Sequence, residues 1–215
     1  KGEVRQDGRL YRQRFERSAA VYHLKDVGPL EDPTETGTTV RFKADPEIFK
    51  ETTVYEFETL ETRLREQAFL NAGVRIVLTD ERDAENVRSE EFHYEGGVSS
   101  FVEYLNRSKE KIHPEPIYFA ATAADNNSTC EIAMQYTDSF NEFILSFANN
   151  IHTVDGGTHE EGFKRALTRI MNDYARKYNI LKESDKKLSG EDVREGLTCV
   201  ISVKVKEAQF EGQTK

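Results

Sequence analysis

The segment at residues 149–164 constrains the fold of this chain more than any other, and it reads NNIHTVDGGTHEEGFK. An apolar run at 140–149 precedes it, and a helical repeat of apolar residues follows it. Gly156 and Gly157 lie between the two, where the backbone needs freedom to turn from a strand into a helix. We therefore expect a strand, a double-glycine turn and a long helix over about 158–178.

The predicted helix carries two kinds of residue on opposite faces. Four apolar residues recur at helical spacing and predict its buried stripe: Phe163, Leu167, Ile170 and Tyr174. Three arginines fall on the other side, with a lysine beside them: Arg165, Arg169, Arg176 and Lys164. Such a row is either a solvated face or a wall that faces phosphate groups. Thr158 and Glu161 have capping-box spacing at the start of the helix.

The first strands of the chain are predicted from turn residues. Asp7-Gly8 is a strong hairpin signal and predicts two strands over 3–16. Residues 17–35 read as a loop, because Gly28-Pro29 interrupts them. A short strand is expected within 36–42.

Two helices are predicted in the first half. Residues 56–71 place apolar side chains on one face and pair Glu61 with Arg65 at i,i+4, and a strand follows at 74–79. The second helix follows Gly96-Gly97, where apolar residues recur at helical spacing.

The second half is richer in strands. Apolar runs predict strands at 117–123, 129–137 and 140–149, and a further strand returns after the long helix at 197–205. That last run alternates, which predicts a strand with one buried face. Strands followed by a helix and a returning strand indicate a compact α+β unit. The charged stretch at 106–116 separates this unit from the first half.

The overall charge limits the kind of partner. The 215 residues carry a formal net charge of −9, which argues against a generic nucleic-acid coat but leaves room for a local basic patch. Cys130 and Cys199 are expected to be buried thiols in a reducing cytosol. No apolar run approaches the ~20 residues that span a bilayer, so we expect no membrane partner. The chain begins at Lys1 without methionine, and we expect a piece of a longer cytoplasmic polypeptide.

Two short motifs could contact a nucleotide. Gln213 and Lys215 stand two residues apart, so their side chains point the same way in an extended segment. An amide and an ammonium group suit a terminal phosphate, although residues with this spacing are most often only solvated. Thr36-Gly37-Thr38 fits either the floor of a nucleotide pocket or an ordinary turn into a strand.

Other catalytic or metal-binding patterns are weak. His152, Asp155 and His159 surround the double glycine, but their spacing is not a standard zinc pattern, so we expect no metal ion bound there. The sequence has no G-x-S-x-G and no Walker loop, and no catalytic nucleophile is predicted.

The string at 149–164 and the final Gln-Thr-Lys together resemble the ATPase half of the B subunit of bacterial type II topoisomerases, DNA gyrase or topoisomerase IV. The resemblance covers nearly the whole chain. It implies the C-terminal part of a GHKL-type α/β sandwich at 1–107, the fold of heat-shock chaperones, mismatch-repair ATPases and histidine kinases. A transducer domain is implied at 112–215, with the βαβ fold of a ribosomal-protein second domain. The implied class is again α+β.

The resemblance also assigns roles to individual residues. Lys215 would sense the charge of the ATP γ-phosphate and Gln213 would be the neutral donor beside it. Thr38 matches a threonine that lies next to the adenine. The helix at 158–178 would border the cavity through which a DNA duplex passes. Its DNA-facing residues would be Lys164, Arg165, Arg169 and Arg176.

The family's activity implies cofactors and partners. In the family, ATP closes two B subunits into a dimer clamp and drives one DNA duplex through another. The implied cofactors are ATP and Mg²⁺, and the implied partners are double-stranded DNA, a second B subunit and the A subunit in a heterotetramer. The family's general-base glutamate, Mg²⁺-binding asparagine, adenine-binding aspartate and glycine-rich lid lie upstream, and these motifs do not occur here. We therefore expect this chain alone neither to bind ATP tightly nor to hydrolyse it.

Two further hypotheses stay open. The chain could be a non-catalytic nucleic-acid-binding module that uses the basic face of helix 158–178, or a sister ATPase of the chaperone or mismatch-repair type. The segment at 149–164, called the diagnostic string below, and the final Gln-Thr-Lys disfavour the sister ATPases, which use other second-domain contacts. The sequence does not separate gyrase from topoisomerase IV. Gln6 stands where relatives often have a basic residue, so no arginine is assigned to the pocket mouth.

Overall fold

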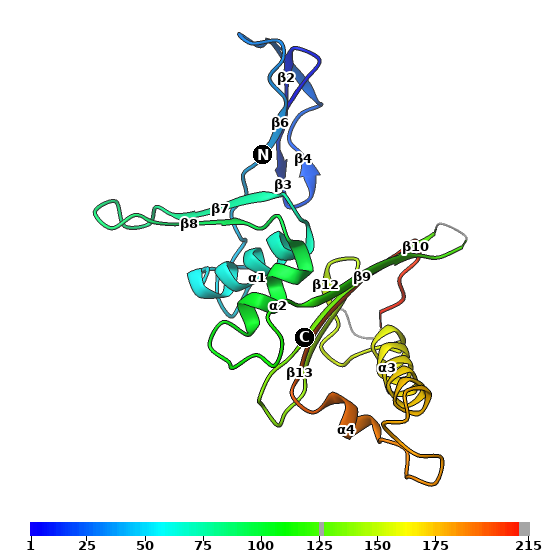
Figure 1. The fold of residues 1–215 in the computed structure, drawn as a ribbon. Helices are drawn as coiled ribbons and strands as arrows, with labels where there is room; N and C mark the ends of the chain where they lie inside the picture. Colours follow the sequence, from blue (N-terminus) through cyan, green and yellow to red (C-terminus); the bar gives the residue numbers. More distant parts are fainter. Residues whose placement is uncertain (125–126, 211–215) are drawn as a thin grey trace. The chain divides into compact units, whose positions relative to one another are not determined.

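The computed structural model of the chain describes residues 1–124 and 127–210, and it divides into two compact units, Lys1–Tyr55 and Glu56–Lys215 (Figure 1). Each unit has its own sheet. Gln213 and Lys215 lie outside the described residues. The domains that the family resemblance implies, 1–107 and 112–215, meet at a boundary other than the one between these two compact units. That division into domains stays a prediction.

The first unit is built on a four-stranded sheet in the order β5-β2-β1-β6. Its strands are β1 (Gly2–Gln6), β2 (Arg9–Gln13), β5 (Lys25–Pro29) and β6 (Gly37–Val40), and a separate short pair joins β3 (Phe15–Glu16) to β4 (Ala19–Ala20). Asp7 and Gly8 have φ of 52° and 70°, which confirms the predicted hairpin turn. The expected loop at 17–35 is wrong in part, because β5 pairs with β2. An edge strand tolerates Gly28 and Pro29.

The second unit is built on a five-stranded sheet in the order β12-β11-β13-β10-β9. Its strands are β9 (Ile117–Thr122), β10 (Ser128–Tyr136), β11 (Phe143–Ala148), β12 (Ile151–His152) and β13 (Leu197–Val205). Strands β11 and β13 run parallel, and the other neighbours run antiparallel. Between β11 and β13 the chain forms α3 (Thr158–Lys177) and α4 (Gly190–Arg194). The second unit therefore contains a strand–helix–strand crossover.

Helices cover both faces of this sheet (Figure 1). On one face α1 (Phe57–Leu70) and α2 (Gly97–Leu105) pack against residues of β10, β11 and β13: Ala133, Phe147 and Val200. On the other face α3 and α4 cover the alternate residues of the same strands: Ile132, Leu197, Cys199 and Ile201. A separate hairpin pairs β7 (Arg75–Asp80) with β8 (Arg88–His93). No helix of the described residues is long and apolar enough to cross a bilayer.

Strand β13 corrects the expectation of one buried face. Thr198, Val200 and Ser202 are 1%, 0% and 2% exposed, as deeply buried as the residues between them. A central strand with helices on both faces loses its alternation, because both sets of side chains are covered. The Thr198 hydroxyl donates to Asn106 Oδ1 at 2.8 Å, so a polar residue is satisfied inside the core.

Helix α1 lies within the predicted range 56–71 and keeps the Glu61–Arg65 ion pair. Helix α2 confirms a helix after Gly96 and begins at Gly97 itself. Helix α3 is confirmed in range but not in its buried stripe. Ile170 and Tyr174 are 58% and 54% exposed, because the buried line of α3 continues instead through Asn172 and Ala175.

The expected capping box on α3 is wrong. Gly157 is its N-cap and makes no side-chain bond, and Thr158 already lies inside the helix. A capping box joins Ser189 and Asp192 on α4 instead. Helices α3 and α4 both begin near a hydroxyl residue with an acid three positions later. Only at α4 does the hydroxyl residue lie at the N-cap, with the extended backbone that a capping box needs.

The thiols and the boundary stretch are held by the sheet. Cys199 is buried and Cys130 is half-buried, so the expectation of two buried thiols is correct only for Cys199, and burial raises the pKa of both.

The stretch at 106–116 is anchored at both ends: Asn106 Nδ2 donates to Gln135 Oε1 at 3.0 Å, and Gln135 Nε2 donates to the His113 carbonyl at 2.9 Å. This polar network holds the stretch on β10.

Candidate functional site

The two asparagines that open the diagnostic string form the turn between β11 and β12. Asn149 and Asn150 have φ of 49° and 64°. The Asn149 side chain accepts from the Val205 amide at 2.9 Å and donates to its carbonyl at 3.0 Å. Asn150 Nδ2 donates to Asn71 Oδ1 at 3.0 Å. The pair therefore fixes the hairpin to the end of β13 and to α1.

The double glycine makes the predicted turn into α3. Gly156 has φ of 76°, and its amide donates to the Thr153 carbonyl. The Ser146 hydroxyl lies 2.7 Å from both Thr153 Oγ1 and a Glu160 carboxylate oxygen. His159 Nε2 lies 3.2 Å from Thr153 Oγ1, and burial lowers the pKa of His159. Within residues 1–124 and 127–210, no group of three or more metal-ligating side chains is placed to hold an ion.

Lys164 is already ion-paired. Its ammonium lies 2.7 Å from Glu160 and 3.5 Å from Glu142, and the hydrogen bond to Glu160 raises the pKa of Lys164. Arg194 of α4 pairs with the same Glu142. Glu142 and Glu160 therefore compensate the charges of Lys164 on α3 and Arg194 on α4.

The remaining predicted cations of α3 are not ion-paired. Arg165 and Arg169 are exposed and Arg176 is half-buried. In the part of the chain that the structure describes, their side chains make no ion pair. All four predicted DNA-facing residues line one hollow of about 720 Å³ beside α3. The structure thus brings the four predicted residues to one hollow. They differ in their partners, because Lys164 is ion-paired and the three arginines have no ion pair among the described residues.

Thr38 lies in the first unit. It pairs with Val4 in the middle of β6, it is exposed, and its hydroxyl has no hydrogen-bond partner among the described residues. The neighbouring hydroxyl of Thr39 accepts from Arg5, which also pairs with Glu35 at 2.9 Å. The assigned contact of Thr38 with a nucleotide stays a prediction.

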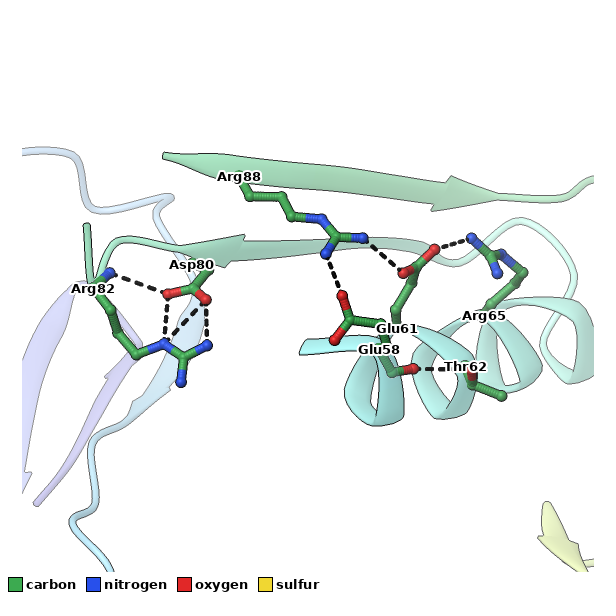
Figure 2. Close-up of polar contacts among 7 residues, drawn as sticks. All are labelled: Glu58, Glu61, Thr62, Arg65, Asp80, Arg82 and Arg88. Carbon is green, nitrogen blue, oxygen red and sulfur yellow. Dashed lines mark hydrogen bonds and ion pairs between the residues drawn. The ribbon is translucent and has the colours of Figure 1, made fainter. Parts of the chain in front are cut away.

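A cluster of arginines and carboxylates between α1 and the β7–β8 hairpin was missed (Figure 2). Arg88 lies 2.6 Å from Glu58 and 3.1 Å from Glu61, and Arg65 also pairs with Glu61. Only Glu61 and Arg65 carry a sequence signal, because they stand four apart on one helix. The contacts of Arg88 join residues about thirty positions apart, which no local pattern reveals.

Comparisons with known proteins place this fold. The family model of DNA gyrase B matches residues 97–215, more than half of the chain. The DNA gyrase B protein of Clostridium acetobutylicum is 56% identical over 213 residues, which cover 99% of this chain and 32% of that protein. The DNA gyrase B protein of Enterococcus faecalis is 55% identical over 212 residues, with the same two shares, 99% and 32%. The chain therefore spans about a third of these relatives.

A solved structure shows the same architecture. The 43K ATPase domain of Thermus thermophilus gyrase B, in complex with an aminocoumarin, superposes with a TM-score of 0.81 at 36% identity, covering 98% of this chain and 56% of that one. The fold is thus of the type II topoisomerase ATPase kind, which confirms the predicted α+β, GHKL-type class. The chain belongs to the DNA gyrase B family.

Proposed function

We propose that the chain is the ATPase and transducer portion of a type II DNA topoisomerase B subunit. It would couple ATP binding and hydrolysis to closure of a B-subunit dimer clamp and to passage of one DNA duplex through another. The observation that carries this proposal is the match to a gyrase B ATPase domain over 98% of the chain. Membership of the DNA gyrase B family favours negative supercoiling over decatenation. The A subunit is the proposed partner in a heterotetramer.

The nucleotide contacts would come from separate parts of the chain. ATP with Mg²⁺ supplies the phosphoryl group and part of the charge compensation for its transfer. The Thr38 hydroxyl has no competing partner in the described residues, which fits a contact near the adenine. Lys215 and Gln213 would stabilise charge on the γ-phosphate, and the general base and the Mg²⁺ ligands would lie outside this chain.

The DNA contacts would come from α3. Arg165 and Arg169 stand one turn apart, so their side chains share a face at about 6 Å of helical rise. Unpaired guanidinium groups on a helix face suit phosphate oxygens, which bind without reading sequence. Lys164 would contact DNA only by exchanging its carboxylate partners for phosphate.

The test of the coupling role is Lys215→Ala in the full-length B subunit with its A subunit and DNA. Losing one charge-assisted contact to the transition state typically costs ~10²–10³ in rate. We expect ATP hydrolysis at saturating ATP to fall by about this factor while ATP binding is largely kept. Lys206→Ala, which removes another exposed lysine earlier in the sequence, serves as the matched control. An unchanged hydrolysis rate in Lys215→Ala would remove this residue from the mechanism.

A non-catalytic nucleic-acid-binding module is the second candidate, because Arg165, Arg169 and Arg176 of α3 have no ion pair among the described residues. For both candidates the isolated chain should not turn over ATP, since the family's general base is expected elsewhere. A steady-state phosphate-release assay on the purified 215-residue chain checks this expectation. Turnover above the background of a Lys215→Ala sample would contradict it.

A further inference from the structure

The hollow beside α3 is more than a helix face, because its second wall comes from another element. One side is the α3 surface from Glu161 to Arg176. The other side is formed by Lys187 and Leu188, which precede α4, and by Gly190 and Arg194 of α4 itself. A volume of about 720 Å³ lies within the range of small-molecule sites.

Cations outnumber acids in the lining of the hollow, although the whole chain carries a net charge of −9. Six cations line it: Lys164, Arg165, Arg169, Arg176, Lys187 and Arg194. Two acids line it as well, Glu161 and Asp173. Lys164 is ion-paired with Glu142 and Glu160, and Arg194 is ion-paired with Glu142. Four cations therefore remain without an ion pair in the described part of the chain, among them Lys187.

The second wall is fixed before any ligand arrives. Asn172 is 7% exposed, and its side chain bonds Leu188 in both directions: Oδ1 accepts from the Leu188 amide at 2.9 Å, and Nδ2 donates to the Leu188 carbonyl at 3.0 Å. The capping box of Ser189 and Asp192 then sets the start of α4. A site with fixed walls loses little conformational entropy on binding.

Two details concern the guanidinium groups of the hollow. Gly190 leaves room for Arg194, since a Cβ at residue 190 would lie only 2.6 Å from an Arg194 terminal nitrogen. Nε of Arg176 is buried and has no hydrogen-bond acceptor among the described residues. A buried donor without an acceptor is costly, so the fold alone does not satisfy the guanidinium of Arg176.

We propose that this hollow binds a free polyphosphate anion, a short chain of consecutive phosphate groups laid along Arg165, Arg169, Arg176 and Lys187. Guanidinium groups match phosphate oxygens in charge and geometry. Along α3, Arg165 and Arg176 are about 16 Å apart in helical rise, so a single phosphate cannot contact both, whereas different groups of one phosphate chain can. The concave shape and the recessed Arg176 favour a free anion over a phosphate flanked by sugars on a duplex.

This proposal shares the α3 arginines with the proposed DNA contact, but it stands without it. Binding of a free anion in the hollow would compete with DNA for Arg165 and Arg169. The anion shares Arg176 with the predicted DNA-facing set as well, and the residue that it uses in addition is Lys187. Lys187 therefore separates the two ideas experimentally.

The experiment is calorimetric titration of the purified chain with sodium tripolyphosphate at low salt and without divalent cations. We expect saturable binding of one anion per chain. Arg176→Gln should weaken it about tenfold or more, and Lys187→Gln should weaken it several-fold, because each removes a charge-assisted contact. Lys177→Gln is the matched control, since it removes one charge from the adjacent position, which does not line the hollow. The thermal midpoint of each variant checks folding, and Lys187→Gln on the loop keeps the test decisive if Arg176→Gln unfolds.

Parallel titrations identify the source and chemistry of the anion. Citrate, a trianion without phosphate groups, should bind far more weakly, and equal binding of citrate would overturn a phosphate site. A short DNA duplex that binds while tripolyphosphate does not would overturn this proposal and leave the DNA contact intact. Tripolyphosphate that binds while the duplex does not would support the site and count against the DNA contact. Equal weakening by Lys177→Gln and Arg176→Gln would also overturn the site.

Discussion

The arginines of the second unit fall into two groups with opposite surroundings. Near α1, Arg65 and Arg88 each contact a carboxylate (Figure 2). Arg65 also lies over the rings of Phe92 and Tyr104, at 5.1 and 5.3 Å from their centroids. At the far end of the hairpin, hydrogen bonds from Arg82 lower the pKa of Asp80 to about 2. On α3 the arginines have no such partners among the described residues.

The difference separates two uses of the same residue. A guanidinium between aromatic rings and a carboxylate has its donors occupied, so it joins elements and is not available to a ligand. An unpaired guanidinium that faces a hollow contributes little to folding and remains free to bind an anion. The number of arginines is therefore less informative about function than the number of their partners. Three predictions test this distinction.

The largest effect is expected at Arg65. Arg65→Ala removes the pair with Glu61, a hydrogen bond to the Tyr104 hydroxyl at 3.1 Å and the stacking on two rings. We expect the free energy of unfolding to fall by about 1–3 kcal/mol, which lowers the thermal midpoint by several degrees. Thermal unfolding followed by circular dichroism measures the change.

The control for this stability measurement is Arg165→Ala. Arg165 is exposed and has no ion-pair partner in the described part of the chain, so its removal should change stability by no more than about 0.5 kcal/mol. Equal destabilisation by the two variants would mean that partners do not distinguish the two groups of arginines.

The second prediction concerns DNA affinity, which should depend on the unpaired arginines of α3 and not on the paired arginines. Arg165→Gln with Arg169→Gln removes two unpaired charges. Each lost phosphate contact should weaken DNA binding roughly tenfold near 0.1 M salt and reduce the salt slope by about 0.9. Fluorescence anisotropy of a labelled duplex at several salt concentrations measures both quantities.

A double variant of paired arginines is the matched control. Arg63→Gln with Arg75→Gln removes the same net charge, but these residues pair with Glu66 and Glu91. We expect an almost unchanged salt slope, because their partners already compensate them. If both double variants weaken DNA binding alike, only the net charge matters and the α3 face has no special role.

Sequence patterns predicted the parts of the fold that depend on neighbouring residues. The Asp7-Gly8 turn and the Glu61–Arg65 pair each follow from spacing within one or two elements. The patterns failed where distant packing decides. Strand β13 is covered on both faces, and Ile170 is exposed although it fits the apolar stripe of α3. Neither outcome can be read from the period of a single element.

The candidate site divides in the same way. The arginine row of α3 was predicted, because its residues repeat along one helix. The pairing of Lys164 with Glu142 was not predicted, and neither was the wall that Asn172 holds through Leu188. These contacts join separate elements, so they become visible only when the chain is folded.

The smallest effect is expected at Glu160. This residue forms an ion pair with Lys164 on α3, as the carboxylates near α1 do with Arg65 and Arg88. Burial works to raise the pKa of Glu160, but hydrogen bonds from Lys164 and Ser146 outweigh it and hold the pKa below its ordinary value. A lowered carboxyl pKa contributes stability that is present above the unfolded value and is lost as pH falls through the folded value. Glu160→Gln should therefore reduce stability at neutral pH and flatten its loss below about pH 4.5.

Urea unfolding midpoints at neutral and acidic pH measure this change. The difference between the chain and Glu160→Gln should shrink as pH falls, because protonated Glu160 no longer attracts Lys164. Glu161→Gln is the control, since Glu161 is exposed and has no ion pair within residues 1–124 and 127–210. A constant difference between the chain and Glu160→Gln at every pH would show that the pair with Lys164 does not stabilise the fold. Lys164 would then belong with the unpaired arginines, available to phosphate without exchanging a partner.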